Sequence, residues 1–273
     1  MNKEQKTWPI YIQTWKKAKP PLRPSKKTLA VIENYLDQKI KQKGSETKVL
    51  ILGSTPEFRS LVISKELIPT VADFSEAIYK GWGTMRTHKG KERFIKQDWR
   101  EINLKEKFDI ILAEASMTVL SKKDMPRFLS KQAELLAQDG YFLNKVWVYL
   151  PDKIKSMEEI VKHYRKYHRG KHFMSIYSPL IYTWFCNQKK NETISLQELH
   201  FTFKQLYEAG ILTIKEFLSI KDFGHENSSL QLCLPPKAEI IKLIKHYFNI
   251  QSTRITEHPF GEICPLFVLT HKV

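Results

Sequence analysis

A glycine and an aspartate, twenty positions apart, have the types and spacing of a nucleoside-binding site. Residues 48–52 read as a short buried strand because Val49 to Leu52 are four consecutive apolar residues, and Gly53 then opens a turn. Asp73 closes the next strand-like run. In a doubly wound sheet, ligands bind beyond the carboxyl ends of the strands, and an acid at this distance can accept hydrogen bonds from ribose hydroxyls. The pair therefore predicts a ribose-binding carboxylate.

The phosphate-binding part of such a site is incomplete in this chain. A dinucleotide fingerprint needs three glycines in the pattern G-x-G-x-x-G, but Gly53 is followed by Ser54, Thr55, Pro56 and Glu57. An ordinary strand-to-helix turn of an α/β protein would look the same, so the rest of the chain has to decide.

Alternating strand-like and helical segments supply the frame for these residues. Strands are expected at 48–52, 71–73, 93–97, 108–113 and 141–149, with helices at about 56–66, from 74 toward 80, and at 122–138. This alternation predicts a Rossmann-like, doubly wound, mostly parallel sheet with right-handed crossovers. After a helix at 237–247, two runs at 248–255 and 265–270 predict a terminal antiparallel hairpin with a loop at 258–261.

Two further segments surround this core. Residues 1–46 read as a helical arm, in which the proline-rich turn 19–24 carries Arg23 and Ser25 caps a helix running to about 43. Residues 151–222 look almost wholly helical, aromatic and basic, as a lid or substrate wall would be. We therefore expect an arm at 1–46, a core at 47–150 and 235–273, and an insertion at 151–234.

The composition limits the class of protein. The chain has 273 residues, 42% of them hydrophobic, so a full globular core is expected. No apolar run approaches the ~18 residues of a membrane span, and the first residues lack the apolar segment of a secretory signal. Its three cysteines, Cys186, Cys233 and Cys264, have neither zinc-site spacing nor an obvious disulfide pattern. We expect a cytoplasmic protein.

The formal net charge of +16 leaves the partner open. Such a charge could attract nucleic acid, acidic lipid or an acidic substrate, but a solvated lysine-rich surface explains it equally simply. The excess is densest at 1–45 and 151–190, where basic residues outnumber acids by eleven to three and nine to three.

Several motifs together resemble the class I S-adenosylmethionine-dependent methyltransferases. The first reads Leu52-Gly-Ser-Thr-Pro-Glu-Phe-Arg59, as in a bacterial branch with Leu-Gly-x-Thr-Pro-Glu in place of the glycine-rich loop. The other matches are Pro21-Leu-Arg-Pro-Ser25, Val71-Ala-Asp-Phe-Ser-Glu76, Gln97-Asp-Trp-Arg100, Phe108-Asp-Ile-Ile-Leu-Ala-Glu114, Asp139-Gly-Tyr-Phe142 and Cys264-Pro-Leu-Phe-Val268. The resemblance covers about 10–150 and 235–271. An acid two residues before the glycine is common in that family, and Ile51 stands there instead.

The resemblance implies S-adenosylmethionine as cofactor and a role for each matched residue. Gly53 and Thr55 would line its methionine part, and Asp73 would accept both ribose hydroxyls. Asp98 would accept from the adenine amino group, beside an apolar wall from Trp99.

Three more residues complete the implied site. Arg23 would pair with the cofactor carboxylate and Glu57 with its amino group, although Glu57 could equally cap its helix. Glu114 would face the methyl group.

A general base is needed only if the acceptor has to lose a proton of high pKa. The candidates are Glu114, His163, His168, His172 and His225, and the sequence does not choose among them.

The acceptor is the least determined part of the expected reaction. No Asn/Asp-Pro-Pro-Tyr/Phe follows the fourth strand, where Glu114-Ala-Ser-Met117 stands, which disfavours amino-group methylation of adenine or glutamine. The aromatic insertion favours a small, partly apolar acceptor over nucleic acid. Two alternatives remain: an RNA methyltransferase or a nucleic-acid-binding protein that keeps the fold without catalysis, and a nucleotide-sugar or dinucleotide enzyme, against which the single glycine argues.

Overall fold

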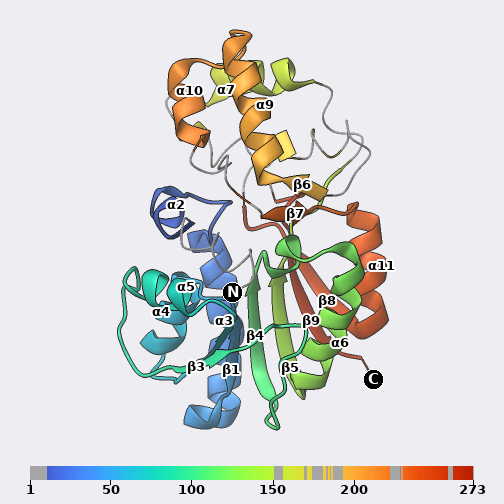
Figure 1. The fold of residues 1–273 in the computed structure, drawn as a ribbon. Helices are drawn as coiled ribbons and strands as arrows, with labels where there is room; N and C mark the ends of the chain where they lie inside the picture. Colours follow the sequence, from blue (N-terminus) through green and yellow to red (C-terminus); the bar gives the residue numbers. More distant parts are fainter. Residues whose placement is uncertain are drawn as a thin grey trace.

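The computed structural model describes residues 11–150, 156–168, 171–173, 181–182, 184, 186, 193–221, 228, 230–257 and 261–272. Its centre is a seven-stranded sheet in the order β3-β2-β1-β4-β5-β9-β8 (Figure 1). The strands are β1 Val49–Leu52, β2 Thr70–Asp73, β3 Arg93–Lys96, β4 Phe108–Glu114, β5 Leu136–Lys145, β8 Phe248–Arg254 and β9 Leu266–His271.

The strand directions confirm the expected Rossmann-like topology. Each neighbouring pair among β1 to β5 is parallel, and β9 runs antiparallel to both β5 and β8. The chain reverses between β1 and β4, because β2 and β3 follow β1 on one side and β4 lies on the other. In such a sheet the reversal opens a crevice at the carboxyl ends of the strands.

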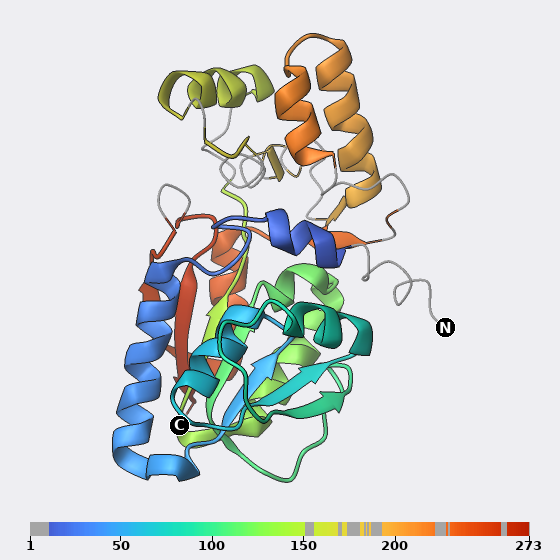
Figure 2. The same cartoon turned by 90° about the vertical axis from the view of Figure 1, so that its left-hand side faces the viewer.

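Helices cover both faces of the sheet, as the apolar runs of its inner strands require. One face packs against α3 (Lys26–Lys43) and α4 (Pro56–Ser64), with Ile32, Leu36, Phe58 and Val62 against Val49, Ile51, Ile110 and Leu112. The other packs against α6 (Met125–Leu135) and α11 (Lys237–Tyr247), with Phe128, Leu129, Ile240 and Ile244 against Leu50, Ile111, Phe142 and Phe267. Figure 2 shows α3 running along the side of the sheet.

The arm and the insertion meet at the carboxyl ends of the strands. Helix α2 (Tyr11–Lys17) contacts α5 (Glu76–Gly83) there. The insertion contains α7 (Met157–Tyr167), α9 (Leu196–Glu208) and α10 (Ile214–Ile220), which stand above the sheet in Figure 1. These helices share a core with Tyr11 and Trp147, so the insertion is packed onto the core and the arm together.

The structure corrects three details of the sequence prediction. The segment 151–222, expected to be almost wholly helical, also contributes a short strand, β6 (Thr193–Ser195), which pairs with β7 (Gln231–Cys233) in a second, two-stranded sheet. The helix expected at 122–138 is a short 3₁₀ turn, η4 (Lys122–Asp124), followed by α6, which ends at Leu135. β5 begins at Leu136 opposite Phe108, with a register shift before Ile110, and ends at Lys145 rather than 149.

Other short elements agree with the sequence. A 3₁₀ turn, η2 (Gly44–Glu46), ends the second arm helix at the expected Gly44, and another, η3 (Ser116–Val119), follows β4. The predicted hairpin is formed by β8 and β9, but residues 258–260 of its connecting loop lie outside the described residues. Within the described part, no helix is both long and apolar enough to span a membrane.

Candidate active site

A pocket lies at the carboxyl ends of β1, β2 and β4, under the arm and the insertion. Its lining brings together five of the eight predicted cofactor residues, namely Gly53, Thr55, Asp73, Trp99 and Glu114. The rest of the wall comes mainly from α2, α5, η3, the segment after β5, and the insertion. The sequence predicted the insertion as a substrate wall but did not single out its lining residues, nor Ser54 and Phe74 within the motifs.

The first turn shapes one end of this pocket. Gly53 has a φ of +91°, a conformation that strongly favours glycine, and its N–H donates to Ala72 O at 2.8 Å. The indole ring of Trp99 lies close to Gly53, since a Cβ added there would be 3.4 Å from the ring. Trp99 Nε1 donates to Ala72 O at 2.7 Å, which fixes the ring as an apolar wall. Gly53 thus combines a left-handed turn with close approach of the indole.

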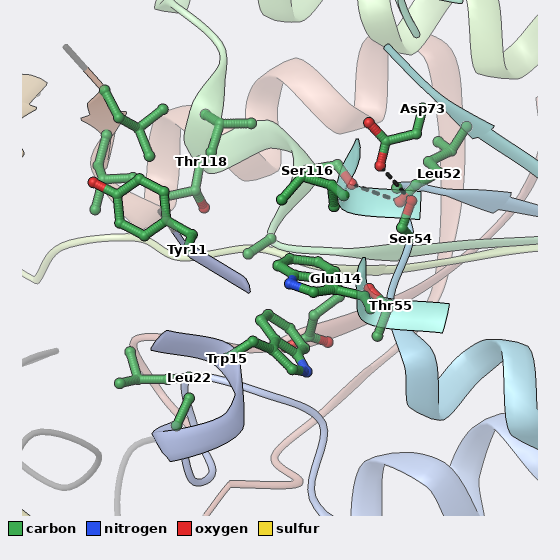
Figure 3. Close-up of a pocket in the computed structure, with 18 of the residues that line it drawn as sticks. Tyr11, Trp15, Leu22, Leu52, Ser54, Thr55, Asp73, Glu114, Ser116 and Thr118 are labelled. Carbon is green, nitrogen blue, oxygen red and sulfur yellow. Dashed lines mark hydrogen bonds between the residues drawn. The ribbon is translucent and has the colours of Figure 1, made fainter. Parts of the chain in front are cut away.

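Asp73 is held at the end of β2 by two donors. Ser54 Oγ donates to Oδ2 at 2.6 Å (Figure 3), and the Ser75 N–H donates to Oδ1 at 2.9 Å. The residue is only 5% exposed, and this burial raises its pKa to about 6, against the opposing effect of those two hydrogen bonds. A carboxylate has about four lone-pair positions, so two further donors can be accepted. The sequence did not single out Ser54, although it directly follows Gly53.

Glu114 belongs to a fully buried charge cluster that the sequence did not predict. Lys145 Nζ donates to Glu114 Oε1 at 2.7 Å, to Glu257 Oε1 at 3.2 Å and to Pro21 O at 2.9 Å. The three charged side chains are 0–3% exposed. The one available signal was a lysine inside the apolar run 141–148.

This cluster sets the protonation of its members. Burial raises the pKa of Glu114 to about 7, although the Lys145 ammonium opposes that rise. Burial alone would lower the pKa of Lys145, but Glu114 and Glu257 outweigh it, so the pKa is raised and the amine stays charged. Cys264 lies near the same charges, and burial raises the pKa of its thiol to about 12. The cluster ties β4, β5, the arm and the β8–β9 connection together.

Three predicted residues do not line the pocket. Arg23 forms an ion pair with Glu57, joining the arm to the first turn of α4. Burial raises the pKa of Glu57, and Arg23 only partly offsets this. Asp98 is engaged by Arg100, whose Nε and Nη2 donate to it at 2.9 and 2.5 Å. Burial would raise the pKa of Asp98, but the bonds from Arg100 outweigh it and lower that pKa.

The histidines stay apart from this pocket. His163, His168 and His172 lie in and just after α7 and are not among the lining residues, and His225 lies outside the described residues. Of the candidate bases in the described part, only Glu114 lines the pocket. Among those same residues, no group of three or more His, Cys, Asp or Glu side chains could hold a metal ion.

Comparisons with known proteins give the fold. Neither sequence-family profiles nor curated protein sequences match the chain. One similar solved structure is the N-methyltransferase NodS from Bradyrhizobium japonicum in complex with S-adenosyl-L-homocysteine, with a TM-score of 0.54, 10% identity and full coverage of both chains. Another, titled a putative Zn-dependent alcohol dehydrogenase from Rhodobacter sphaeroides, has a TM-score of 0.64, 13% identity and full coverage of both.

A third similar structure, the PH0226 protein from Pyrococcus horikoshii, has a TM-score of 0.50 at 14% identity, covering 95% of this chain and 99% of that one. At such identities these similarities establish architecture rather than reaction. The chain has the Rossmann-like fold found in S-adenosylmethionine-dependent methyltransferases.

Proposed function

We propose that this chain is an S-adenosylmethionine-dependent methyltransferase that acts on a small-molecule acceptor. The observation that supports this best is the buried Asp73 carboxylate, anchored by Ser54 and the Ser75 N–H at the end of β2 and lining the pocket. Its remaining lone pairs suit the two ribose hydroxyls of an adenosyl group.

The charges around the pocket fit that cofactor, which carries a positive sulfonium, an ammonium and one carboxylate. Glu57 Oε2 is buried and accepts no hydrogen bond from the described residues. A buried carboxylate oxygen without a donor is unfavourable, so a cationic ligand nearby would be stabilising. Arg23, now paired with Glu57, is the candidate for the ligand carboxylate.

The residues of this chain would mainly hold and align the reactants. Bound S-adenosylmethionine supplies a methyl group on a positively charged sulfur, which keeps the electron pair of the broken carbon–sulfur bond. Gly53, Thr55 and Trp99 would line the cofactor, and the arm and insertion would exclude water from the reacting atoms. Glu114 would accept a proton where the acceptor has one to lose. We take 151–234 as the substrate lid in this scheme.

Calorimetry with S-adenosylhomocysteine, the demethylated cofactor, tests the proposal directly. We expect the wild-type chain to bind it, and Asp73→Ala to weaken binding by about 1–3 kcal/mol, roughly five- to 150-fold. Asp139→Ala is the matched control, because Asp139 is 55% exposed, pairs with Lys39 and does not line the pocket. Equal affinity of the wild type and Asp73→Ala would remove the basis of the proposal.

A further inference from the structure

The pocket has two ends of different chemistry. In Figure 3, Asp73 and Ser54 lie on one side, Tyr11 and Thr118 lie on the other, and Glu114 lies between them. The Asp73 end is formed by the strand ends and the proposed cofactor residues. We call the other side the acceptor end. It is formed by the arm, η3, the segment after β5 and the insertion, with lining residues Tyr11, Leu22, Thr118, Val119, Trp147, Tyr182, Leu196, Leu230 and Leu232.

The described residues that line the acceptor end are mainly apolar or aromatic, and none of them is cationic. Trp147, Leu196 and Leu232 are 5%, 1% and 7% exposed, and the Trp147 and Tyr182 rings lie with centroids 6.1 Å apart. The chain contains 45 lysines and arginines, yet none of them, and no histidine, is among the lining residues in the described part. A phosphate or carboxylate would be desolvated here without a counter-charge, which is strongly unfavourable.

Of the buried pocket-lining atoms without a hydrogen-bond partner among the described residues, Trp15 Nε1 and Trp82 Nε1 are indole donors, and two others are oxygens. These oxygens are Glu114 Oε2 and Thr118 Oγ1. The Glu114 side chain is 2% exposed, and Thr118 is 4% exposed. Glu114 lines a pocket whose other carboxylate, Asp73, already holds two donors. Unpaired buried atoms of this kind are rare and are explained here by a ligand that supplies the missing partners.

The charge on Glu114 favours a neutral donor over a cationic one. Lys145 Nζ lies 2.7 Å from Glu114 Oε1 and 3.2 Å from Glu257 Oε1, so this ammonium offsets part of the charge of both carboxylates. A second ammonium at Oε2 would be close to the Lys145 ammonium, within a low-dielectric site where repulsion is strong. A hydroxyl group donates without adding charge, and its proton needs a base when its oxygen is methylated.

From these observations we infer that the acceptor is an uncharged aromatic molecule whose hydroxyl group donates to Glu114 Oε2. This rests on the proposed methyltransferase function. As the acceptor oxygen forms its new bond to carbon, its proton passes to Glu114 Oε2, which Lys145 keeps in place. Thr118 Oγ1 provides a second polar contact beside the aromatic walls, and the apolar lining excludes phosphorylated acceptors, including nucleic acid.

A pair of probes that differ by one charged group tests this assignment. 2-Naphthol and 2-naphthyl phosphate are titrated by calorimetry into the chain saturated with S-adenosylhomocysteine. We expect 2-naphthol to bind and its phosphate ester to bind at least about tenfold more weakly, since the ester would bury an uncompensated dianion. Equal or tighter binding of the phosphate ester, or no binding of 2-naphthol, would overturn the inference.

Two substitutions locate the bound hydroxyl. Glu114→Gln and Thr118→Val should each weaken 2-naphthol about three- to tenfold, the loss expected for one hydrogen bond. Thr253→Val, an exposed position on β8 outside the pocket, is the control and should leave the affinity unchanged. Unchanged affinity in Glu114→Gln would contradict the assignment.

The two binding measurements, with S-adenosylhomocysteine and with 2-naphthol, distinguish the methyltransferase proposal from the acceptor assignment. Binding of S-adenosylhomocysteine without binding of 2-naphthol removes only the acceptor assignment. Failure to bind S-adenosylhomocysteine removes the methyltransferase proposal itself.

Discussion

Replacing Asp73 by asparagine should stabilise the fold and weaken ligand binding at the same time. Burial raises the pKa of Asp73 from 3.8 to about 6. The folded chain therefore binds the Asp73 proton more tightly than the unfolded chain does. Stability falls as the pH rises from about 4 to about 6, and the penalty is complete above that range.

The size of this penalty follows from the same pKa values. A rise from 3.8 to about 6 corresponds to about 3 kcal/mol, at about 1.4 kcal/mol for each pKa step of one. Asparagine is neutral, and its single oxygen can accept from the Ser75 N–H while its amide N–H donates to Ser54 Oγ, but these bonds lose the help of a charge and weaken by about 1–2 kcal/mol together. We expect Asp73→Asn to raise the free energy of unfolding by about 1–2 kcal/mol at about pH 8.

Urea unfolding at about pH 8 and about pH 4.5, followed by circular dichroism, measures this effect. The advantage of Asp73→Asn should shrink or reverse at the lower pH, where Asp73 is itself largely protonated. In parallel, calorimetry should show S-adenosylhomocysteine binding at least about tenfold weaker, because an amide accepts the ribose hydroxyls through one oxygen only. Asp139→Asn is the control and should neither stabilise the fold at about pH 8 nor weaken S-adenosylhomocysteine binding. Asp139 is mostly exposed, and its pKa is lowered, chiefly by its bond from Lys39.

An opposite result would be informative. A variant that is less stable at every pH, and binds the ligand normally, would make Asp73 a structural anchor for the Gly53 and α5 turns. The reasoning about a ribose-binding carboxylate would then be refuted.

Three other perturbations test neighbouring parts of the site. Lys145→Met should lower the free energy of unfolding by about 3–5 kcal/mol at neutral pH, because it leaves the buried Glu114 carboxylate without its partner. The loss should be smaller in acid, where Glu114 is protonated. Urea titrations at several pH values measure it, and a loss that does not depend on pH would contradict the reasoning. Gly53→Ala should be about 1–2 kcal/mol less stable because of the positive φ, and an unchanged melting curve would contradict that conformation. The double exchange Arg23→Glu with Glu57→Arg should restore the ion pair, and its melting temperature should exceed that of either single variant. It should not restore S-adenosylhomocysteine binding in calorimetry. Recovery of binding would show that the pair is only structural.

The framework of the site was accessible from the sequence because local patterns determine it. The run Val49–Leu52 predicts a buried strand, and the helix 237–247 was located to the residue, since its ends follow from Pro235-Pro236 and the start of the next strand-like run. The 136–140 segment was mistaken for the end of a helix and a turn because Asp139-Gly140 is a strong turn signal. In the structure, Leu136 instead pairs with Phe108 on the neighbouring strand. This pairing forms only on folding, so the local turn signal could not reveal it.

The electrostatics of the site could not be read in the same way. Glu114 lies on β4, Lys145 on β5 and Glu257 in the β8–β9 connection, and the Pro21 carbonyl that Lys145 also contacts comes from the arm. No spacing rule relates four such distant segments. Likewise, the resemblance assigns Arg23 to the cofactor carboxylate and Glu57 to its amino group, whereas in the structure the two side chains bind each other.

Burial of carboxylates at the strand ends suggests why a cofactor would bind tightly to this fold. The pKa values of Asp73, Glu114 and Glu57 are all raised, chiefly by burial, so each ionised group destabilises the chain as it stands. A ligand that brings hydroxyl donors and positive charge relieves this penalty and lowers those pKa values, and the energy recovered appears as affinity. Binding of S-adenosylhomocysteine should therefore release protons near pH 6, because burial raises the pKa of Asp73 to about 6 and hydrogen bonds from the ribose hydroxyls would lower it. Calorimetry in buffers of different ionisation enthalpy would detect that release, and proton uptake instead would show that the carboxylates do not meet the ligand.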